Sequence, residues 1–457
     1  MSGLSAQIAS FTARTRYDDL PPDAIEKTKQ CILDALGVSL AASSLGEGCR
    51  AFIDLATEQG GREQSTLLGE SRKVPVEAAA LVNGALAHAL DYEDSHDIAL
   101  VHPNAPTVPA ALALAEAFGP VSGKELIAAV AVGCDVAVRL SLALKVSIAE
   151  FGWYPPPILA AFGATAAAAK ILRLDEQQVR DALSLALCQA TCSNEIIYSP
   201  QSVIRAVRDA FAARAGVTAA LLAQRGIRGF DEPLEGRAGF FAAFARGQYD
   251  ADKLTRDLGQ VFEIANISFK PWPSCRGTHA AIEAALKCRE AVRVEDIENV
   301  TIHGGPMLRM LAEPRPSKIR PATAIDAKFS LPFTIATALV HGHVGLQSFR
   351  SECLEDERVL RLAARTSVSA DAAPRTAIGA RLRIRTRGGV EREMEVLTPL
   401  GSPTHPMSSQ ALIDKFAECA GLATRPLGAD AARRFAERTL SLEELTDVGT
   451  ELMPLLR

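Results

Sequence analysis

The feature that most restricts the fold of this chain is a series of alanine- and glycine-rich segments that are apolar around almost the whole helical circumference. They are VEAAALVNGALAHAL, PTVPAALALAEAFG, SGKELIAAVAVGCDVAVRLSLAL, PPPILAAFGATAAAAKILRL and AFAARAGVTAALLAQRG. A helix that is apolar all round is buried, and small side chains let its neighbours approach closely. Residues 5 to about 265 are therefore expected to form a body of tightly packed helices.

Capping residues mark the ends of several of these helices. Pro21 and Pro22 precede a long run of helical periodicity, which predicts a helix start there. Ser122 and Glu125 form a capping-box signature, so a second helix is expected to begin after Ser122. Gly119 fits the glycine that commonly follows a helix. These signals divide the region into separate helices.

The pattern changes near Asn266, where strand-like alternation appears beside helical periodicity. ENVTIHG predicts a strand, and ARLRIRTRGGVEREMEVLT predicts two strands joined at Gly388 and Gly389. THAAIEAALKCRE and AKFSLPFTIATALVHG predict helices, and the C-terminal stretch is helical again. We therefore expect a mainly α fold. Residues 1–266 and 405–457 would form an all-helical domain completed by the C-terminal helices, and residues 267–404 a smaller inserted α+β domain.

Length and charge argue against several classes of protein. At 457 residues the chain exceeds what one hydrophobic core usually supports, so two domains are expected. A formal net charge of -5 argues against nucleic acid as a partner and gives no attraction to an anionic membrane surface. The N-terminal residues lack the apolar core of a signal peptide, and charged residues or glycine interrupt the apolar stretches before the ~18–20 residues of a membrane span. We expect a cytoplasmic protein with reduced thiols.

The segment HALDYEDSHDIALVHPNAP, from His88 to Pro106, concentrates acidic and histidine side chains in otherwise apolar surroundings. A metal site, an acid–base site and a solvated loop could each use such residues. An EF-hand is excluded, because its sixth position is His96 instead of glycine and its twelfth is His102 instead of glutamate. A hard-cation site at Asp91 and Asp94 stays open, and together with His96 it would describe a metal-dependent lyase.

Apolar residues 98–101 argue against a wholly solvated loop in this segment. His102 then stands shortly before a helix that is expected to start near Pro106 or Thr107. The dipole at a helix N-terminus favours the neutral imidazole, which can act as a base or donate a hydrogen bond. His102 is therefore a candidate acid–base residue.

Four stretches in order along the chain carry a family resemblance. They are HALDYEDSHDIALVHPNAPTVPAALALAEAFG, SGKELIAAVAVGCDVAVRL, FKPWPSCRGTHAAIEAAL and AKFSLPFTIATAL. Together they resemble the MmgE/PrpD family, which includes 2-methylcitrate dehydratase, cis-aconitate decarboxylase and iminodisuccinate epimerase. The resemblance implies a helical domain completed by the C-terminus, an active site between the two domains and a homodimer. It also implies proton transfer beside carboxylates with neither a metal nor an organic cofactor.

The resemblance carries over to five positions and fails at three. The matching residues are Asp91, Ser95, His102, Lys270 and His279. Where decarboxylase-like members have a histidine, a lysine and a tyrosine, this chain has Tyr154, Arg205 and Phe333. These departures argue against cis-aconitate decarboxylation and weaken an assignment as 2-methylcitrate dehydratase.

The remaining groups suggest proton abstraction α to a carboxylate of a small di- or tricarboxylate. Lys270 and Tyr154 would be the acid–base pair, on opposite faces of the carbon, and burial beside an arginine would lower the pKa of Lys270. Asp91 and His102 would position or protonate the substrate. Cations stabilise the charge that develops on the carboxylate. The expected substrate-binding residues are Ser95, His96, Arg205, Arg276 and His279.

An epimerase resembling iminodisuccinate epimerase is the reading that the exchange of histidine for Tyr154 favours. Three alternatives remain open: a 2-methylcitrate dehydratase-like hydro-lyase, a catalytically silent carboxylate-binding protein, and the metal-dependent lyase described above. In an epimerase one group removes the proton and a second returns it, whereas a dehydratase needs an acid at the leaving hydroxyl.

Overall fold

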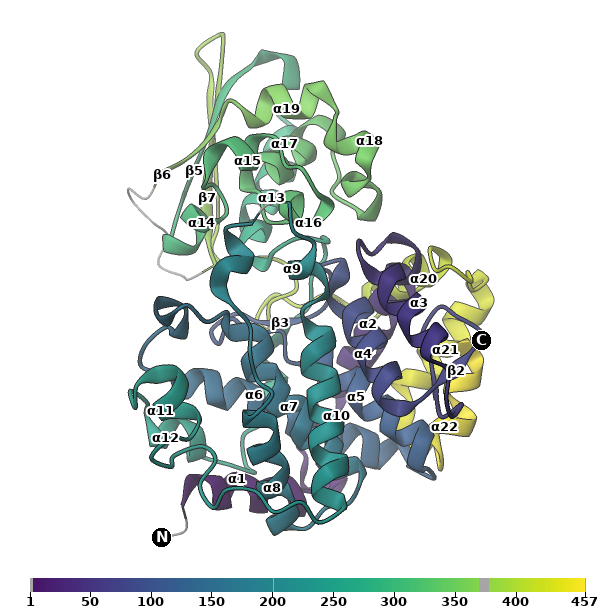
Figure 1. The fold of residues 1–457 in the computed structure, drawn as a ribbon. Helices are drawn as coiled ribbons and strands as arrows, with labels where there is room; N and C mark the ends of the chain where they lie inside the picture. The colour runs from purple at the N-terminus through teal and green to yellow at the C-terminus, as the bar shows by residue number, and fades with distance from the viewer. Residues whose placement is uncertain (1–2, 200, 370–377, 457) are drawn as a thin grey trace.

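Residues 3–199, 201–369 and 378–456 are described by a computed structural model. Figure 1 shows a larger helical body below and a smaller body of helices and strands above. The expected fold class, mainly helical with a small sheet domain, is confirmed.

The lower body is built from helices that occupy most of the first 255 residues. These helices are α1 (Leu4–Arg14), α2 (Pro22–Leu45), α3 (Cys49–Gln59), α4 (Val76–Ala89), α5 (Asn104–Phe118), α6 (Gly123–Ala143), α7 (Pro155–Ile171), α8 (Glu176–Leu187), α9 (Ile204–Val207), α10 (Asp209–Gln224), α11 (Phe240–Ala245) and α12 (Ala251–Thr255). The capping box predicted at the start of α6 is present, with the Ser122 hydroxyl accepting from the Glu125 amide. Helix α5 ends before Gly119 as expected, but this glycine has φ -56 and is not left-handed.

Small residues permit very close helix packing at the centre of the lower body. Helices α6 and α7 pack against each other, and Gly133 faces Gly163 at their contact. A Cβ at Gly133 would lie 2.7 Å from the carbonyl oxygen of Gly163, and a Cβ at Gly163 would lie 2.6 Å from that of Gly133. Larger side chains there would force the helices apart, so the expectation of close approach is confirmed.

Helix α6 is long and apolar enough to cross a membrane by length and composition alone, contrary to our expectation that charges would interrupt every such stretch. Its two buried charged residues pair with each other, and Arg139 Nε lies 2.6 Å from Asp135 Oδ2. Of its apolar 18-residue window, 89% is buried within the protein. In this fold α6 is a core helix.

The C-terminal helices return to the lower body, as Figure 1 shows in yellow. They are α20 (Ser409–Gly421), α21 (Ala429–Leu440) and α22 (Val448–Glu451). Helices α20 and α21 pack on α2, and α22 packs on α5. In addition, Lys415 of α20 donates to the carbonyl oxygens of Tyr92 at 2.7 Å and Lys270 at 3.0 Å. The C-terminus thus holds two loops from distant parts of the chain.

The upper body is a four-stranded sheet covered by helices. Its elements are α13 (His279–Arg289), β5 (Ile297–Gly304), α14 (Pro306–Met310), α15 (Arg315–Ile319), α16 (Ala324–Lys328), α17 (Leu331–His341), α18 (Ser351–Leu354), α19 (Glu357–Ala363), β6 (Thr366–Ser369), β7 (Ala380–Thr386) and β8 (Glu391–Val396). The strand order is β6-β5-β7-β8, with β5 and β6 parallel and the other neighbours antiparallel. Helix α13 packs against β7 and β8.

Two sequence expectations for the upper body have different outcomes. The hairpin is confirmed, because β7 and β8 pair with Leu382 opposite Met394 and turn at residues 387–390. The single helix expected over AKFSLPFTIATALVHG is wrong. It breaks into α16 and α17 at Ser330, whose hydroxyl caps the second helix by accepting from the Phe333 amide. Strand β6 was not anticipated.

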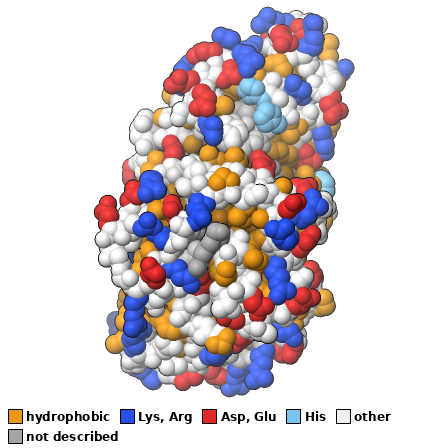
Figure 2. Space-filling view, turned by 90° about the vertical axis from the view of Figure 1, so that its right-hand side faces the viewer, with side chains coloured by type: hydrophobic (Ala, Val, Ile, Leu, Met, Phe, Trp, Pro, Cys, Tyr) orange, Lys and Arg blue, Asp and Glu red, His pale blue; other side chains and the backbone are white. Residues whose placement is uncertain are grey.

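The lower body is not purely helical, because it contains two short antiparallel strand pairs. Strand β1 (Ser65–Thr66) pairs with β2 (Lys73–Val74), and β3 (Ser95–His96) pairs with β4 (Ile267–Ser268). The second pair joins the acidic segment to the chain that leads into the upper body. On the face shown in Figure 2, acidic and basic side chains are interspersed over both bodies.

Candidate active site

A cavity of about 470 Å³ opens where the two bodies meet. The lower body contributes residues from the acidic segment and from the start of α7, among them His102 and Tyr154. The upper body contributes residues around η5 (Arg276–Thr278) and α14. Of the nine site residues expected from the sequence, six line this cavity: Ser95, His96, His102, Tyr154, Arg205 and Arg276.

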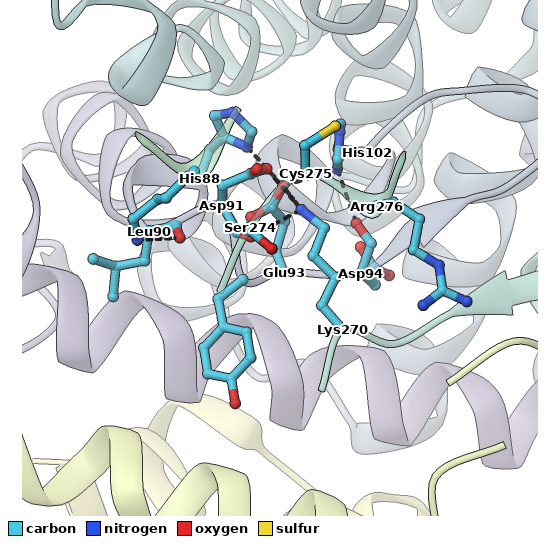
Figure 3. A network of polar contacts seen from close by, with 12 residues as sticks. His88, Leu90, Asp91, Glu93, Asp94, His102, Lys270, Ser274, Cys275 and Arg276 are labelled. Atoms are coloured by element: carbon cyan, nitrogen blue, oxygen red, sulfur yellow. Dashed lines mark hydrogen bonds and ion pairs between the residues drawn. The ribbon is translucent and has the colours of Figure 1, made fainter. Parts of the chain in front are cut away.

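Beneath the cavity, Lys270 is fully buried and points into a group of carboxylates (Figure 3). Its Nζ lies 2.7 Å from Asp91 Oδ1, 3.0 Å from the Asp91 carbonyl oxygen and 3.5 Å from Glu93 Oε1. One carboxylate oxygen of Asp91, Oδ1, and its backbone carbonyl oxygen therefore accept from the same ammonium. Asp91 lies just after α4 and has a left-handed backbone, with φ 49. The acidic segment and β4 therefore meet at an internal ion pair.

The expectation that Lys270 has a lowered pKa is wrong. Burial alone would lower it, but the charges of Asp91 and Glu93 prevail, so the pKa of Lys270 is raised above its ordinary value. Lys270 also lies outside the wall of the cavity that Tyr154 lines. The structure thus does not place the two side chains as a facing acid–base pair, and Lys270 is a fixed cation below the site.

Glu93, which sequence reasoning did not single out, connects this ion pair to two histidines. Its Oε1 lies 2.7 Å from His88 Nδ1 and 2.8 Å from His102 Nδ1. Burial acts against ionisation, yet the neighbouring His88, Lys270 and His102 hold the pKa of Glu93 well below its usual range. Burial also lowers the pKa of His88, aided by the charge of Arg208. His88 is therefore a neutral donor to an ionised carboxylate.

His102 is the histidine of this group that reaches the cavity. Its Nδ1 faces Glu93 Oε1 and also the Asp94 carbonyl oxygen, at 3.1 Å. Both partners are acceptors, so Nδ1 carries a proton, and in the neutral imidazole the lone pair is on Nε2. The side chain is 14% exposed. His102 thus combines a fixed tautomer with access to the cavity, two residues before α5 begins.

Tyr154 and Arg205 form a second wall of the cavity. Tyr154 precedes α7 directly, and its hydroxyl accepts from Arg205 Nη2 at 3.5 Å. The Arg205 guanidinium carbon lies 3.4 Å from the centre of the Phe329 ring. Arg205 has no carboxylate partner among the residues that the structure describes, and its Nε has no hydrogen-bond partner there. This guanidinium can therefore accept an anionic ligand.

Arg276, the other arginine expected to bind carboxylates, has its donors occupied. Its Nε donates to Asp97 Oδ1 at 3.0 Å, its Nη1 to the Leu400 carbonyl oxygen at 2.9 Å, and its Nη2 to Ser402 Oγ at 2.6 Å. These partners come from the acidic segment and from the chain that returns to the lower body. Arg276 thus fastens the joint between the bodies, which does not support a role in binding the substrate carboxylate.

Of the other three residues expected to bind substrate, two make structural contacts and one is available to a ligand. His279 is buried, its Nε2 lies 3.1 Å from the Ser274 carbonyl oxygen, and burial lowers its pKa far below the usual range, so it is a neutral structural residue. His96 accepts from the Ala99 amide at 3.0 Å, which shapes the loop after β3. Ser95 is buried on the cavity wall, and its hydroxyl has no hydrogen-bond partner among the described residues. Ser95 is available to a ligand.

The metal-binding alternative involves a different set of residues from the one expected. Asp94 bonds Asn104, and His96 Nε2 lies 3.4 Å from Glu263, so Asp91, Asp94 and His96 do not form a common site. Ligand atoms of His88, Asp91, Glu93 and His102 do lie within 4.8 Å of one another. The Lys270 ammonium contacts two of these carboxylates. This donor set therefore already holds an internal cation.

Three buried basic residues near the site were given no functional role from the sequence. Burial lowers the pKa of Lys328 to about 8, and its Nζ donates to the Leu90 carbonyl oxygen at 2.5 Å. Arg208 is buried, with Nε 3.6 Å from Asp209 Oδ2. Lys318 is buried beside Asp326. Lys328 stands in one of the four stretches that carry the family resemblance, but the sequence does not show that these three residues are buried, because their burial depends on how the two bodies meet.

Phe333, read in the sequence as a changed site residue, lies away from the cavity wall. It is fully buried in α17, and its ring centre is 6.3 Å from that of Phe349. It is a core residue, so its identity says little about the reaction.

A larger cavity of about 620 Å³ is lined by residues 189–215, including Arg208, and does not include His102 or Tyr154 in its wall.

Comparisons with known proteins agree with this architecture. Residues 6–252 match the MmgE/PrpD N-terminal domain, and residues 272–444 match the MmgE/PrpD C-terminal domain. The chain is 27% identical to the cis-aconitate decarboxylase-like protein oryM of Aspergillus oryzae, over 99% of this chain and 97% of that protein. It is 26% identical to a cis-aconitate decarboxylase of Aspergillus terreus, over 100% and 96% of the two chains. It is also 26% identical to the human cis-aconitate decarboxylase, over 77% and 73%. Because the two domain matches together span most of its length, the chain belongs to the MmgE/PrpD family of enzymes.

Proposed function

We propose that this protein is a lyase that moves a proton at the carbon next to a carboxylate of a small di- or tricarboxylate, with His102 as the acid–base residue. The observation that carries the proposal is the close contact of His102 Nδ1 with Glu93 Oε1, at 2.8 Å, in a side chain that lines the cavity. The names of the relatives, which are cis-aconitate decarboxylases, support a lyase.

The geometry supports specific tasks for the cavity residues. Arg205 would hold a carboxylate through its guanidinium, which has no carboxylate partner among the described residues, and the Ser95 hydroxyl would help to orient it. The His102 Nε2 lone pair would take the proton next to that carboxylate, while Glu93 stabilises the imidazolium that forms. Charge that develops on the substrate would be stabilised by the Arg205 guanidinium.

The lyase reaction then depends on the group that leaves. Elimination of water needs an acid at the departing hydroxyl, and the Tyr154 phenol is the second proton donor on the wall. Loss of carbon dioxide instead needs a carboxylate placed beside apolar groups such as Phe329, followed by protonation of the carbon. For this second reaction His102 would act as the imidazolium and pass its Nε2 proton to the carbon, while Arg205 holds the remaining carboxylate as in the elimination.

Epimerisation is a second candidate, with His102 replacing Lys270 in the acid–base pair. The observation that favours it is that His102 and Tyr154 line one cavity from separate segments of the chain. Two such groups could remove and return a proton on different faces of one carbon. The transfer requires no bond other than carbon–hydrogen to break.

NMR in D2O separates these outcomes. The protein is incubated with succinate derivatives, citrate-like acids and cis-aconitate, and the proton next to the carboxylate is followed. A new olefinic product or loss of carbon dioxide supports the lyase, and deuterium incorporation without net conversion supports the epimerase. His343→Gln, at a solvent-exposed position outside the cavity wall, is the control. Absence of both exchange and product with every acid of this class contradicts the proposal.

A further inference from the structure

Among the residues that the structure describes, the cavity combines the unpaired Arg205 guanidinium with a wall that is otherwise mostly apolar. On the lower body its apolar residues include Leu100 and Ile197, and on the upper body they include Met310, Phe329 and Ile378. A compact polyacid would leave this surface bare. The volume of about 470 Å³ also exceeds what two or three carboxylates on a short carbon chain require.

The charges that face the cavity limit the number of carboxylates it can pair. Arg205 and Arg276 line it, but Arg276 is already paired with Asp97. Lys270, which lies below, is paired with Asp91. Arg205 alone of these three lacks a carboxylate partner among the described residues. A tricarboxylate would bring two or more anionic groups without a cation, and burying an unpaired carboxylate is costly.

Two exposed apolar residues extend the surface towards solvent. Leu100 is 50% exposed and Met310 is 37% exposed, and both line the cavity. Leu100 also has a left-handed backbone with φ 55, in the loop that links His96 to Val101. A branched apolar residue rarely adopts this conformation or stands in water, so the fold places leucine there against local preference. Such a position is typical of a surface that meets an apolar ligand.

We infer that the substrate is a dicarboxylate that carries an alkyl or aryl substituent, with the substituent lying along Leu100, Ile197, Met310 and Ile378. This inference rests on the proposed function, because it places the reacting carbon between Arg205 and His102. One carboxylate pairs with Arg205, and the Ser95 hydroxyl contacts the same polar end. The substituent extends away from that end, between the two bodies.

Calorimetric binding of unreactive acids tests the chain-length dependence. The probes are succinate, methylsuccinate, butylsuccinate and hexylsuccinate, with propane-1,2,3-tricarboxylate for comparison. Burying each added methylene should tighten binding by about two- to fourfold. Hexylsuccinate should bind at least about tenfold tighter than the tricarboxylate, because it leaves one carboxylate instead of two without a cation and also buries its alkyl chain. Affinity that stays flat or falls with chain length, or tighter binding of the tricarboxylate, overturns the inference.

Matched variants locate the alkyl surface. Met310→Glu and Leu100→Asp, both at exposed positions, should remove the gain with chain length, and the thermal unfolding midpoint reports whether the fold is kept. Val390→Glu, an equally exposed apolar residue on the β7–β8 turn, should keep the gain. Arg205→Met should weaken every probe by a similar factor without changing the gain per methylene. A normal gain in Met310→Glu and Leu100→Asp overturns the inference.

Failure of this inference and failure of the proposed function give different results. Alkyl-dependent binding with no exchange or product in D2O supports the binding surface but overturns the lyase and epimerase proposals. Turnover of short acids, combined with flat binding along the alkyl series, overturns the inference and leaves the proposed function standing.

Discussion

The buried carboxylate cluster and the cavity wall above it both contain a basic side chain, but only the one in the cluster has carboxylate partners among the described residues. In the cluster, the Lys270 ammonium lies 2.7 Å from Asp91 and 3.5 Å from Glu93, so each charge has a partner. On the wall, Arg205 has no carboxylate partner in the described part of the chain. The difference indicates that compensated charges hold geometry, whereas an uncompensated charge is left for a ligand. His102 belongs to both regions.

The sharpest way to break the cluster is Asp91→Asn. The substitution leaves the Lys270 ammonium buried with a single distant carboxylate, and breaking one partner of a buried pair typically costs about 3–5 kcal/mol. Urea denaturation should show that loss in the free energy of unfolding. Glu176→Gln removes a partner of the exposed Arg14 and should cost less than about 1 kcal/mol.

The double variant Asp91→Asn with Lys270→Met is the decisive control for this pair. It removes both charges, so stability should recover part of the loss seen in Asp91→Asn. If the single and double variants are equally destabilised, the ion pair does not hold this region together.

His102 connects the two regions, and His102→Gln should lower the turnover rate by about 10²–10⁴-fold. Glutamine is a polar side chain of similar size, but it cannot exchange a proton at neutral pH. Steady-state kinetics with the substrate identified in D2O measures the change, and His343→Gln, at a solvent-exposed position, should leave the rate as in the wild type. Near-normal turnover in His102→Gln would assign the proton transfer to another residue.

The two arginines of the wall should respond in opposite ways. Arg205→Met should raise KM or Kd about 10- to 100-fold, as expected for losing a charge-assisted hydrogen bond of about 1.5–3 kcal/mol. Arg276→Met should lower the free energy of unfolding, because it releases Asp97 and the 399–402 segment. Arg205→Lys should restore part of the binding. An Arg276→Met variant that loses affinity at unchanged stability would reverse the comparison.

A smaller effect is expected from Lys328, a cation near the site without a carboxylate hydrogen bond. Its pKa is about 8 in the folded protein and about 10.5 in the unfolded chain, so the unfolded chain binds more protons between these values. Wild-type stability attributable to this group therefore rises from pH 8 to 10.5. Lys328→Met should gain about 1–2 kcal/mol at pH 7, net of the lost bond to Leu90, and the gain should vanish near pH 10.5. Urea denaturation at the two pH values measures this difference.

Local residue patterns predicted the fold more reliably than the chemistry of the site. The Ser122 cap and the Gly388–Gly389 turn depend on neighbours in the sequence, and both are confirmed. The break at Ser330 was missed because the apolar periodicity continues across it. The state of Arg276 could not be read at all, since its partners lie 179 and 126 residues away in the chain. The same limit applies to Glu93, which looks like one acid among several until His88 and Lys270 surround it.

The chain enters and leaves the upper body at a single seam, where the Phe269 amide donates to the Gly401 carbonyl oxygen at 2.9 Å. Gly401, with φ 90, leaves only 2.0 Å between a notional Cβ and the Phe269 carbonyl oxygen, so glycine is required there. Because the chain enters and leaves the upper body at neighbouring positions, the segment between them can be exchanged as one unit. Chimaeras that exchange it between relatives would carry Met310 and Ile378 with them while keeping His102 and Arg205, and selectivity could be transplanted apart from the acid–base machinery.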